Sequence, residues 1–167
     1  MPSETVCRTV QTARPAKRSN NMPKATFYTH VDQIPLFTCR LIARAIRDGG
    51  RVLVWSDSFG QVQELDKTLW QYEAESFVPH EVWTIEYPMP TDTPVLLATG
   101  DRIPEITENM TVLNLSDDFW NAAPVLPERI LEIVGGSFEE LAEARGRFAA
   151  YRKSGFDIGH HDMGGKA

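Results

Sequence analysis

Short, β-branched apolar runs alternate along this chain with segments whose apolar residues recur at helical spacing, and this alternation constrains the fold most. Arg51–Trp55 is such a run, and Gly49-Gly50 ends the helical segment before it. Strands that alternate with helices predict a mostly parallel sheet with helices on both faces. We therefore expect a single Rossmann-like α/β domain, and 167 residues suffice to bury its core.

Spacing and capping signals predict the individual elements. Pro35 suits the first turn of one helix. Ser137 and Glu140 form a capping box for the last helix, which should end near Ser154 with Gly155 as a left-handed cap. The predicted strands are Ala25–Thr29, Arg51–Trp55, Val95–Ala98, Thr111–Leu115 and Ile130–Val134; the other predicted helices are Ile34–Asp48 and one capped by Asp57 or Ser58 that runs to about Tyr72, and a turn or brief helix is expected near Ile103-Pro104.

The net charge is unevenly distributed along the chain. The whole sequence carries −6, and residues 1–21 hold four basic side chains against the single acidic Glu4, which is a local charge of +3. Residues 22–167 therefore carry −9. Because an acidic domain repels the DNA backbone, we expect little direct DNA binding and a link to nucleic acid through protein partners.

Both ends of the chain are predicted to lie outside the folded domain. Residues 1–21 are polar and basic without periodicity, so they should form a disordered extension. Two interpretations of this extension stay open: a targeting peptide, although no apolar h-region is present, and a natural start at Met22. Residues 159–167 are predicted to be a flexible tail.

Cysteine spacing and hydropathy indicate the cellular compartment in which this protein is expected. Cys7 and Cys39 lie 32 positions apart without CxxC spacing, so neither a disulfide framework nor a zinc site is indicated. No apolar run approaches the roughly 20 residues that cross a bilayer. We expect a soluble protein of the reducing cytoplasm that makes no membrane contact.

Signals for catalysis are weak. No GxGxxG or GxxxxGK[ST] follows a predicted strand, so a backbone cradle for phosphates is missing. Asp117-Asp118 fits a solvated turn, and His160-His161-Asp162 lies in a glycine-rich end without supporting side chains for a metal. His80 has no serine or cysteine partner. We expect no catalytic residue, no metal and no cofactor.

Three aromatic residues, Trp70, Tyr72 and Phe77, gather where a predicted helix ends. Trp70 lies five positions after Leu65 and so leaves the apolar stripe to which Leu65 and Leu69 belong. Tryptophan is also enriched at interface hot spots. Two interpretations stay open: Trp70 and Phe77 fill the core, or they form a protein-docking surface.

The last predicted helix carries one continuous face of apolar and basic residues. That face contains Leu141, Arg145, Phe148 and Arg152, and Arg147 and Tyr151 form the adjacent stripe. An apolar groove flanked by arginines suits an acidic peptide with an aromatic side chain and a terminal carboxylate. The alternative is a solvated helix whose arginines favour its negative C-terminal end.

Three stretches in this order resemble the chi subunit family of DNA polymerase III. They are Ala25–Tyr28, Ala74–His80, and the segment that runs from Ala144-Arg145 through Tyr151-Arg152 to Gly155-Phe156. The similarity spans roughly residues 24–158, so residues 22–158 are identified as a chi-like α/β domain. The resemblance implies a non-catalytic clamp-loader subunit that links the polymerase to single-stranded-DNA-binding protein during DNA replication.

The resemblance also implies two binding surfaces. One would bind the psi subunit of the clamp loader through Trp70, Phe77, Pro79 and His80. The other would hold the acidic C-terminal tail of single-stranded-DNA-binding protein along the last helix.

For the tail, the resemblance offers Arg145 as the clamp for the terminal carboxylate, with Val134, Phe148 and Gly155 as the pocket wall. Some family members have a lysine where this chain has Leu141. Arg147 and Arg152 are candidates to supply the missing charge.

Two other classes of function stay open. A nucleotide- or nucleic-acid-handling enzyme on a Rossmann-like fold would need a glycine cradle or a catalytic pair at a strand end. A generic binding module would not recognise the acidic tail.

Overall fold

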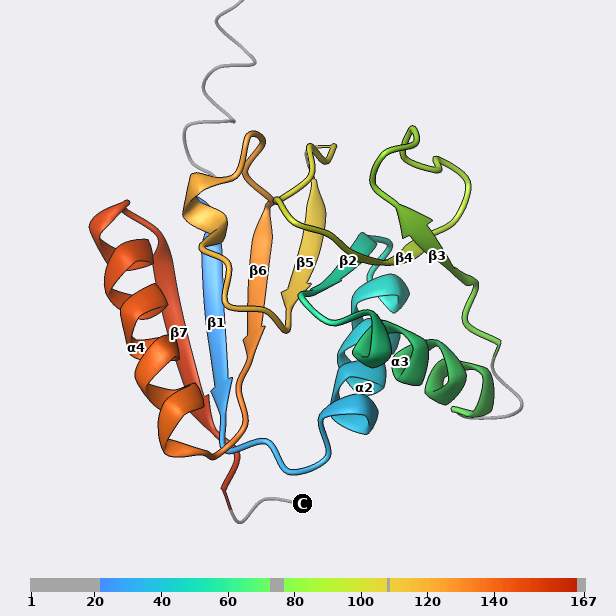
Figure 1. Ribbon diagram of the computed structural model, residues 1–167. Helices are drawn as coiled ribbons and strands as arrows, with labels where there is room; N and C mark the ends of the chain where they lie inside the picture. The colour runs from blue at the N-terminus through green and yellow to red at the C-terminus, as the bar shows by residue number, and fades with distance from the viewer. Residues whose placement is uncertain (1–21, 73–76, 108, 165–167) are drawn as a thin grey trace, which may run out of the picture.

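The computed structural model describes residues 22–72, 77–107 and 109–164, which form one parallel sheet with helices on both faces (Figure 1). The strand order is β3-β4-β2-β5-β6-β1-β7. The strands are β1 (Lys24–Thr29), β2 (Arg51–Ser56), β3 (His80–Thr84), β4 (Val95–Thr99), β5 (Met110–Asn114), β6 (Arg129–Ile133) and β7 (Asp157–Asp162). The helices are α2 (Ile34–Arg47), α3 (Phe59–Gln71), α4 (Phe138–Lys153) and the short 3-10 helix η1 (Trp120–Ala122). The predicted α/β fold is confirmed.

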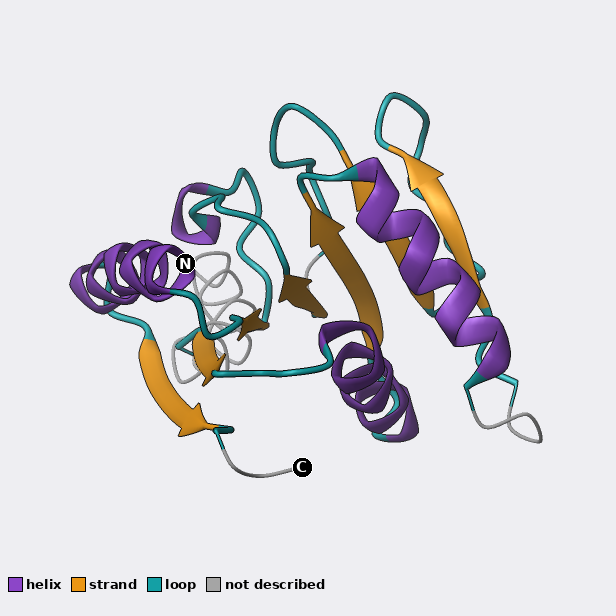
Figure 2. Cartoon of the chain, turned by 60° about the horizontal axis from the view of Figure 1, so that its bottom comes forward, coloured by secondary structure: helices purple, strands orange, loops and turns teal. Residues whose placement is uncertain are grey.

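The side chains of β2 alternate between two cores. Val52 and Val54 pack with α2 and α3 on one face, whereas Leu53 and Trp55 point to the opposite face and join a core that includes Tyr151 of α4. The helices divide accordingly: α2 and α3 lie together over the β2 and β4 part of the sheet, and α4 lies over β1 and β7 (Figures 1 and 2). Burial on both faces explains why the central strands read as continuous apolar runs.

The sequence patterns did not predict two of the strands or η1, and both strands lie at sheet edges. Only Trp83 is buried in β3, and β7 has no buried residue. Backbone pairing with β1, from Lys24 with Asp157 to Thr29 with Asp162, holds β7 in place. Residues 159–162 therefore lie in a strand instead of the predicted flexible tail, and the segment around residues 103–104 is irregular.

The ends of α4 follow the predicted signals with one difference. Ser137 Oγ accepts from the Glu140 amide at 3.1 Å, but the Glu140 carboxylate accepts from the Gly135 amide at 3.1 Å and does not return to Ser137. At the other end Gly155 has φ +89°, and the Phe156 amide donates to the Tyr151 carbonyl at 3.0 Å. This is a Schellman cap, as predicted.

None of the helices in the described part of the chain is long and apolar enough to cross a membrane.

Candidate protein-docking surfaces

The aromatic residues at the end of α3 form an exposed surface. Trp70 is 59% exposed and Phe77 is 66% exposed, and their ring centroids lie 5.5 Å apart. The interpretation that they fill the core is therefore wrong. Pro79 is also exposed, while Val78 between them is buried and anchors the segment against the α2 and α3 core. Residues 74–76 of the resembling stretch lie outside the described residues.

His80 supports this surface from below. Its side chain is 1% exposed, and its ring centroid lies 5.0 Å from that of Trp70. The Nδ1 atom donates to the Val78 carbonyl at 2.7 Å, and Nε2 lies 3.0 Å from the Asp66 carboxylate of α3. Because its side chain is almost fully buried and its ring contacts that of Trp70, His80 supports the Trp70 ring and offers a partner little surface of its own.

The outer face of α4 presents two free arginines. Arg145 and Arg152 are both exposed, and neither has an ion pair within the ranges that the structure describes. Phe148 is half-buried, and its ring lies 5.3 Å from that of Phe27. Charge and apolar area are thus adjacent on one helix.

The structure brings together only some of the residues predicted to hold the acidic tail. Val134, Leu141 and Phe148 belong to or pack against one apolar cluster, in which Val134 is buried. Gly155 lies at the opposite end of α4 from Val134, roughly 24 Å away along the helix axis. Gly155 therefore caps the helix and does not share a pocket wall with Val134.

The prediction that Arg147 supplies charge to a tail-binding groove is wrong. Arg147 is 4% exposed, and its Nε donates to Glu132 Oε1 at 2.9 Å. Glu132, on β6, is fully buried and also accepts from the Tyr151 hydroxyl and from Asn114 Nδ2. The Tyr151 hydroxyl in turn accepts from the Trp120 amide at 3.2 Å. Arg147 therefore belongs to a buried polar network that joins α4 to β5, β6 and η1.

Burial sets the electrostatics of this network. Desolvation raises the pKa of the Glu132 carboxyl, while the Arg147 guanidinium and the Tyr151 and Asn114 donors oppose that rise. Burial, followed by the neighbouring Glu132 carboxylate, also raises the pKa of Tyr151 above its usual range. The stability of this network therefore depends on keeping both the Glu132 and the Arg147 charges.

The opposite flank of α4 is acidic. Hydrogen bonding with the Asp117 carboxyl, together with its charge, raises the pKa of Glu143, and Glu139 adds negative charge nearby. Asp118, by contrast, accepts from Trp55 Nε1 at 2.7 Å and so has a structural role. An anionic ligand would approach α4 from the side of Arg145 and Arg152.

Sequence reasoning missed two exposed aromatic residues near α4: Phe119, which follows β5, and Phe138, which follows β6. Phe119 is 44% exposed and its ring lies over Gly146, beside Arg145, while Phe138 at the start of α4 is 80% exposed. Phe119 and Trp120 are adjacent, but only Trp120 is buried. No pattern in the sequence separates the two, because Phe119 immediately precedes η1 and Trp120 begins it.

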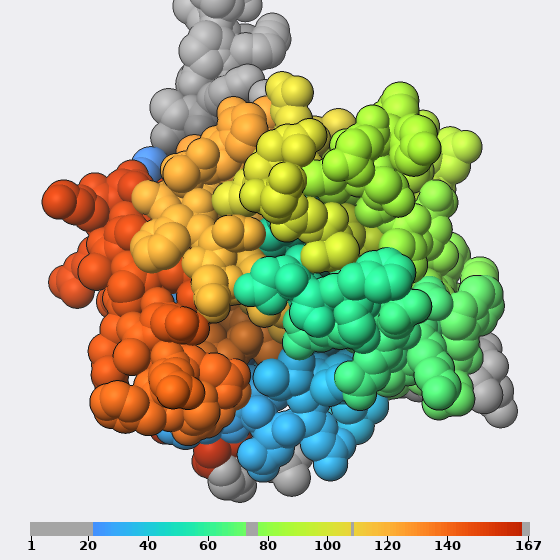
Figure 3. Space-filling view, viewed as in Figure 1, coloured from blue at the N-terminus to red at the C-terminus, as the bar shows by residue number. Residues whose placement is uncertain are grey.

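The two surfaces lie on opposite sides of the molecule. α4 packs on β1 and β7, and α3 packs on β3 and β4 at the other end of the sheet. In the space-filling view, α4 (orange to red) and α3 (teal to green) are separated by the body of the domain (Figure 3). Within residues 22–72, 77–107 and 109–164, no three His, Cys, Asp or Glu side chains gather to hold a metal ion.

These features define a class: a small parallel α/β protein that carries exposed aromatic and arginine side chains on separate helices. The particular family follows from comparison with known proteins. The family model described as DNA polymerase III chi subunit, HolC, matches residues 22–159, and the chain belongs to that family. The family is a non-catalytic accessory subunit, so the enzyme alternative is wrong.

Curated relatives agree with this assignment. The chain is 31% identical over 145 residues to the DNA polymerase III subunit chi of Escherichia coli K12. The aligned region covers 82% of this chain and 96% of that protein. It is 28% identical over 125 residues to the subunit of the same name from Pseudomonas aeruginosa, covering 75% of this chain and 83% of that protein.

Proposed function

We propose that this protein is an adaptor within the DNA polymerase III clamp loader that joins the psi subunit to the acidic C-terminal tail of single-stranded-DNA-binding protein during DNA replication. The observation that carries the proposal is the separation of two unlike docking surfaces at opposite sides of the sheet (Figure 3). A connector needs two sites that can be occupied at the same time, and the separation of these two surfaces supports that role.

Arg145 is the proposed clamp for the terminal carboxylate of the tail. It is exposed and free of ion pairs in the described part of the chain, so its guanidinium is available for a charge-assisted bond. Leu141, Phe148 and Phe119 offer apolar surface on either side for the apolar end of the tail. Arg152 lies two turns further along α4 and supplies a second positive charge for the acidic residues.

Trp70 and Phe77 are the proposed anchors for psi. Both rings are more than half exposed and stand together, and His80 holds the Trp70 ring from below. Large, rigid aromatic side chains of this kind dominate binding energy at protein interfaces. Pro79 restricts the backbone beside them, which lowers the entropy lost on binding.

Titration of a fluorescently labelled tail peptide tests the tail site. A micromolar-range Kd is expected, because so small an interface buries few side chains. Arg145→Ala should raise the Kd roughly tenfold or more, because charge-assisted bonds contribute about 1.5–3 kcal/mol. Arg47→Ala is the matched control: it removes an exposed arginine of α2 and should leave the Kd unchanged.

The proposal makes the two sites independent. Arg145→Ala should leave psi binding intact, and Trp70→Ala should leave tail affinity intact. Equal tail affinity in the wild type and in a correctly folded Arg145→Ala variant would remove Arg145 from the site. Loss of both activities in either variant would contradict the two-surface arrangement.

A further inference from the structure

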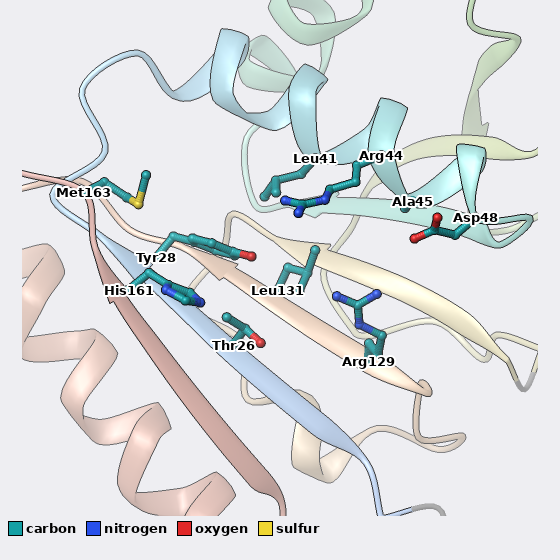
Figure 4. A pocket seen from close by; sticks show the side chains of 10 residues that line it. All are labelled: Thr26, Tyr28, Leu41, Arg44, Ala45, Asp48, Arg129, Leu131, His161 and Met163. Atoms are coloured by element: carbon teal, nitrogen blue, oxygen red, sulfur yellow. The ribbon is translucent and has the colours of Figure 1, made fainter. Parts of the chain in front are cut away.

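Among the described residues, a helix covers only one face of one part of the parallel sheet. α4 covers β1 and β7 through contacts such as Tyr151 with Phe27. On the other face, Thr26 and Tyr28 of β1 line a pocket of about 500 Å³ that opens between the sheet and α2 (Figure 4). Parallel sheets are usually covered on both faces, so this open area is unusual.

The strand register places the floor of the pocket in three rows across β6, β1 and β7. The rows are Arg129, Lys24 and Asp157; then Leu131, Thr26 and Gly159; then Ile133, Tyr28 and His161. Tyr28 and His161 stack, with ring centroids 5.3 Å apart. Gly159 has no side chain, which leaves the floor open above Thr26. The row residues that line the pocket itself are Arg129, Leu131, Thr26, Tyr28 and His161, so one end of the floor is basic and the other is aromatic.

Two arginines from different elements line this pocket without partners. Arg44 projects from α2 over the sheet, and Arg129 rises from the start of β6 (Figure 4). Neither forms an ion pair or a side-chain hydrogen bond anywhere in the described residues. Residues 22–167 carry a net charge of −9, so unpaired arginines that line one pocket mark a local reversal of charge.

The α2 groove comprises this pocket and a second one further along the same helix. A second pocket of about 220 Å³ shares Met163 with the first and is lined by Leu36, Phe37 and Arg40. From Leu36 to Asp48 the groove follows α2 for roughly 18 Å. That length accommodates about five residues of extended peptide.

We propose that this α2 groove binds a short acidic peptide segment that also bears aliphatic side chains. Its carboxylates would pair with Arg40, Arg44 and Arg129, for which bidentate bonds are available. Its aliphatic side chains would pack on Leu41, Leu131 and Met163, which line the two pockets. The site is distinct from the α4 surface and does not depend on the proposed function.

A peptide fits these observations better than a nucleic acid. Aliphatic side chains make up much of the lining, and they match aliphatic residues better than sugar or phosphate. Asp48 lines the same pocket and Asp157 stands in its basic row, so both would repel phosphates. The acidic domain also disfavours a polyanion that extends beyond the groove, whereas a short peptide ends within it.

Affinity selection from a defined peptide pool tests the proposal. The probes are labelled peptides of about five residues in which Asp or Glu alternates with Leu, Ile, Val, Met or Phe. Both peptide ends are blocked, the C-terminus as an amide, so that a carboxylate clamp at Arg145 cannot contribute. A pool with Asn and Gln in place of the acids is the matched probe control.

The wild-type chain should retain the acidic pool over the neutral pool. Arg44→Glu and Arg129→Glu should each weaken binding of the retained peptides by about tenfold or more, because each reverses a charge-assisted contact. Arg47→Glu, on the same helix but outside the pocket lining, should bind as the wild type does. All three side chains are exposed, so the variants should unfold at the wild-type temperature.

Three results would overturn the proposal. They are equal retention of the acidic and neutral pools, equal retention by the wild type and the Arg44→Glu variant, and tighter binding of a labelled oligothymidylate that Arg44→Glu abolishes. The last result would assign the groove to single-stranded nucleic acid. None of them bears on tail binding at Arg145.

Discussion

Replacing Arg147 with Met should destabilise the fold, because it leaves Glu132 buried without its counter-charge. Glu132 is 0% exposed, and its remaining partners are the Tyr151 hydroxyl and Asn114 Nδ2. Removing one member of a buried ion pair costs about 3–5 kcal/mol, and the two remaining donors favour the lower end, about 3 kcal/mol. For a domain of this size, that loss lowers the melting temperature by roughly 6–12 °C.

The dependence of this loss on pH identifies its cause. Burial raises the pKa of Glu132, and Arg147→Met removes the charge that opposes the rise. Between the unfolded pKa near ~4.3 and the raised folded pKa, the folded state binds more protons than the unfolded state, so stability falls as pH increases. The variant should therefore lose less stability at acidic pH, near the unfolded pKa, than at neutral pH.

Urea unfolding of four proteins completes the test: the wild type, Arg147→Met, Glu132→Gln, and the double variant. The double variant should recover most of the stability, because the neutral glutamine side chain at position 132 keeps the Tyr151 and Asn114 contacts and buries no charge. A loss of less than about 1 kcal/mol of unfolding free energy in Arg147→Met would contradict this prediction, because that is the range of an exposed ion pair. An equal loss at acidic and neutral pH would also contradict it.

Four further outcomes are expected. Trp70→Ala should change unfolding free energy by less than about 0.5 kcal/mol, because the ring is exposed, yet weaken psi binding in a pull-down or titration by about 2 kcal/mol or more. Tyr151→Phe should cost about 1–3 kcal/mol in urea unfolding, because it leaves the buried Glu132 carboxylate short of a donor. A chain that begins at Met22 should bind oligothymidylate weakly in anisotropy measurements, because its net charge is −9. Burial raises the pKa of Cys39 to about 11, so peptide-level mass spectrometry should find it slow to alkylate at pH 8 in the folded protein.

For each of these four predictions, one result would contradict it. A large fall in melting temperature for Trp70→Ala would mean that the ring supports the core. Wild-type stability in Tyr151→Phe would show that the Glu132 carboxylate does not need that donor. Tight, salt-sensitive binding of DNA would contradict the adaptor assignment. Rapid alkylation of Cys39 under native conditions would show that α2 opens readily.

The central part of the fold was predictable because its local signals and its burial agree. β2 reads as a continuous apolar run since both of its faces are covered. The edge strands β3 and β7 lack that signal, because most of their side chains face solvent and backbone pairing alone defines them. Strand pairing depends on residues far apart in the sequence, so a local sequence pattern cannot predict it.

The site was predictable to the extent that helical spacing decides exposure. Trp70 lies off the apolar stripe of α3 and is exposed, as that spacing indicates. Helical spacing did not predict the burial of Arg147. A charged side chain favours the surface, but Glu132 on β6 gives this guanidinium a buried partner. The acceptor lies on another element, so only the tertiary structure could place the guanidinium inside.

The position of β1 has a consequence for the order in which this protein can be made. β1 is the first of the described strands along the chain, yet it lies between β6 and β7, and Lys24 pairs with Arg129 and Asp157. Both partners leave the ribosome more than 100 residues later, so that half of the sheet cannot close during most of translation. The nascent chain must keep β1 unpaired until β6 has emerged, and this half of the sheet is complete only when β7 follows, so the apolar side chains of β1 stay uncovered through most of synthesis.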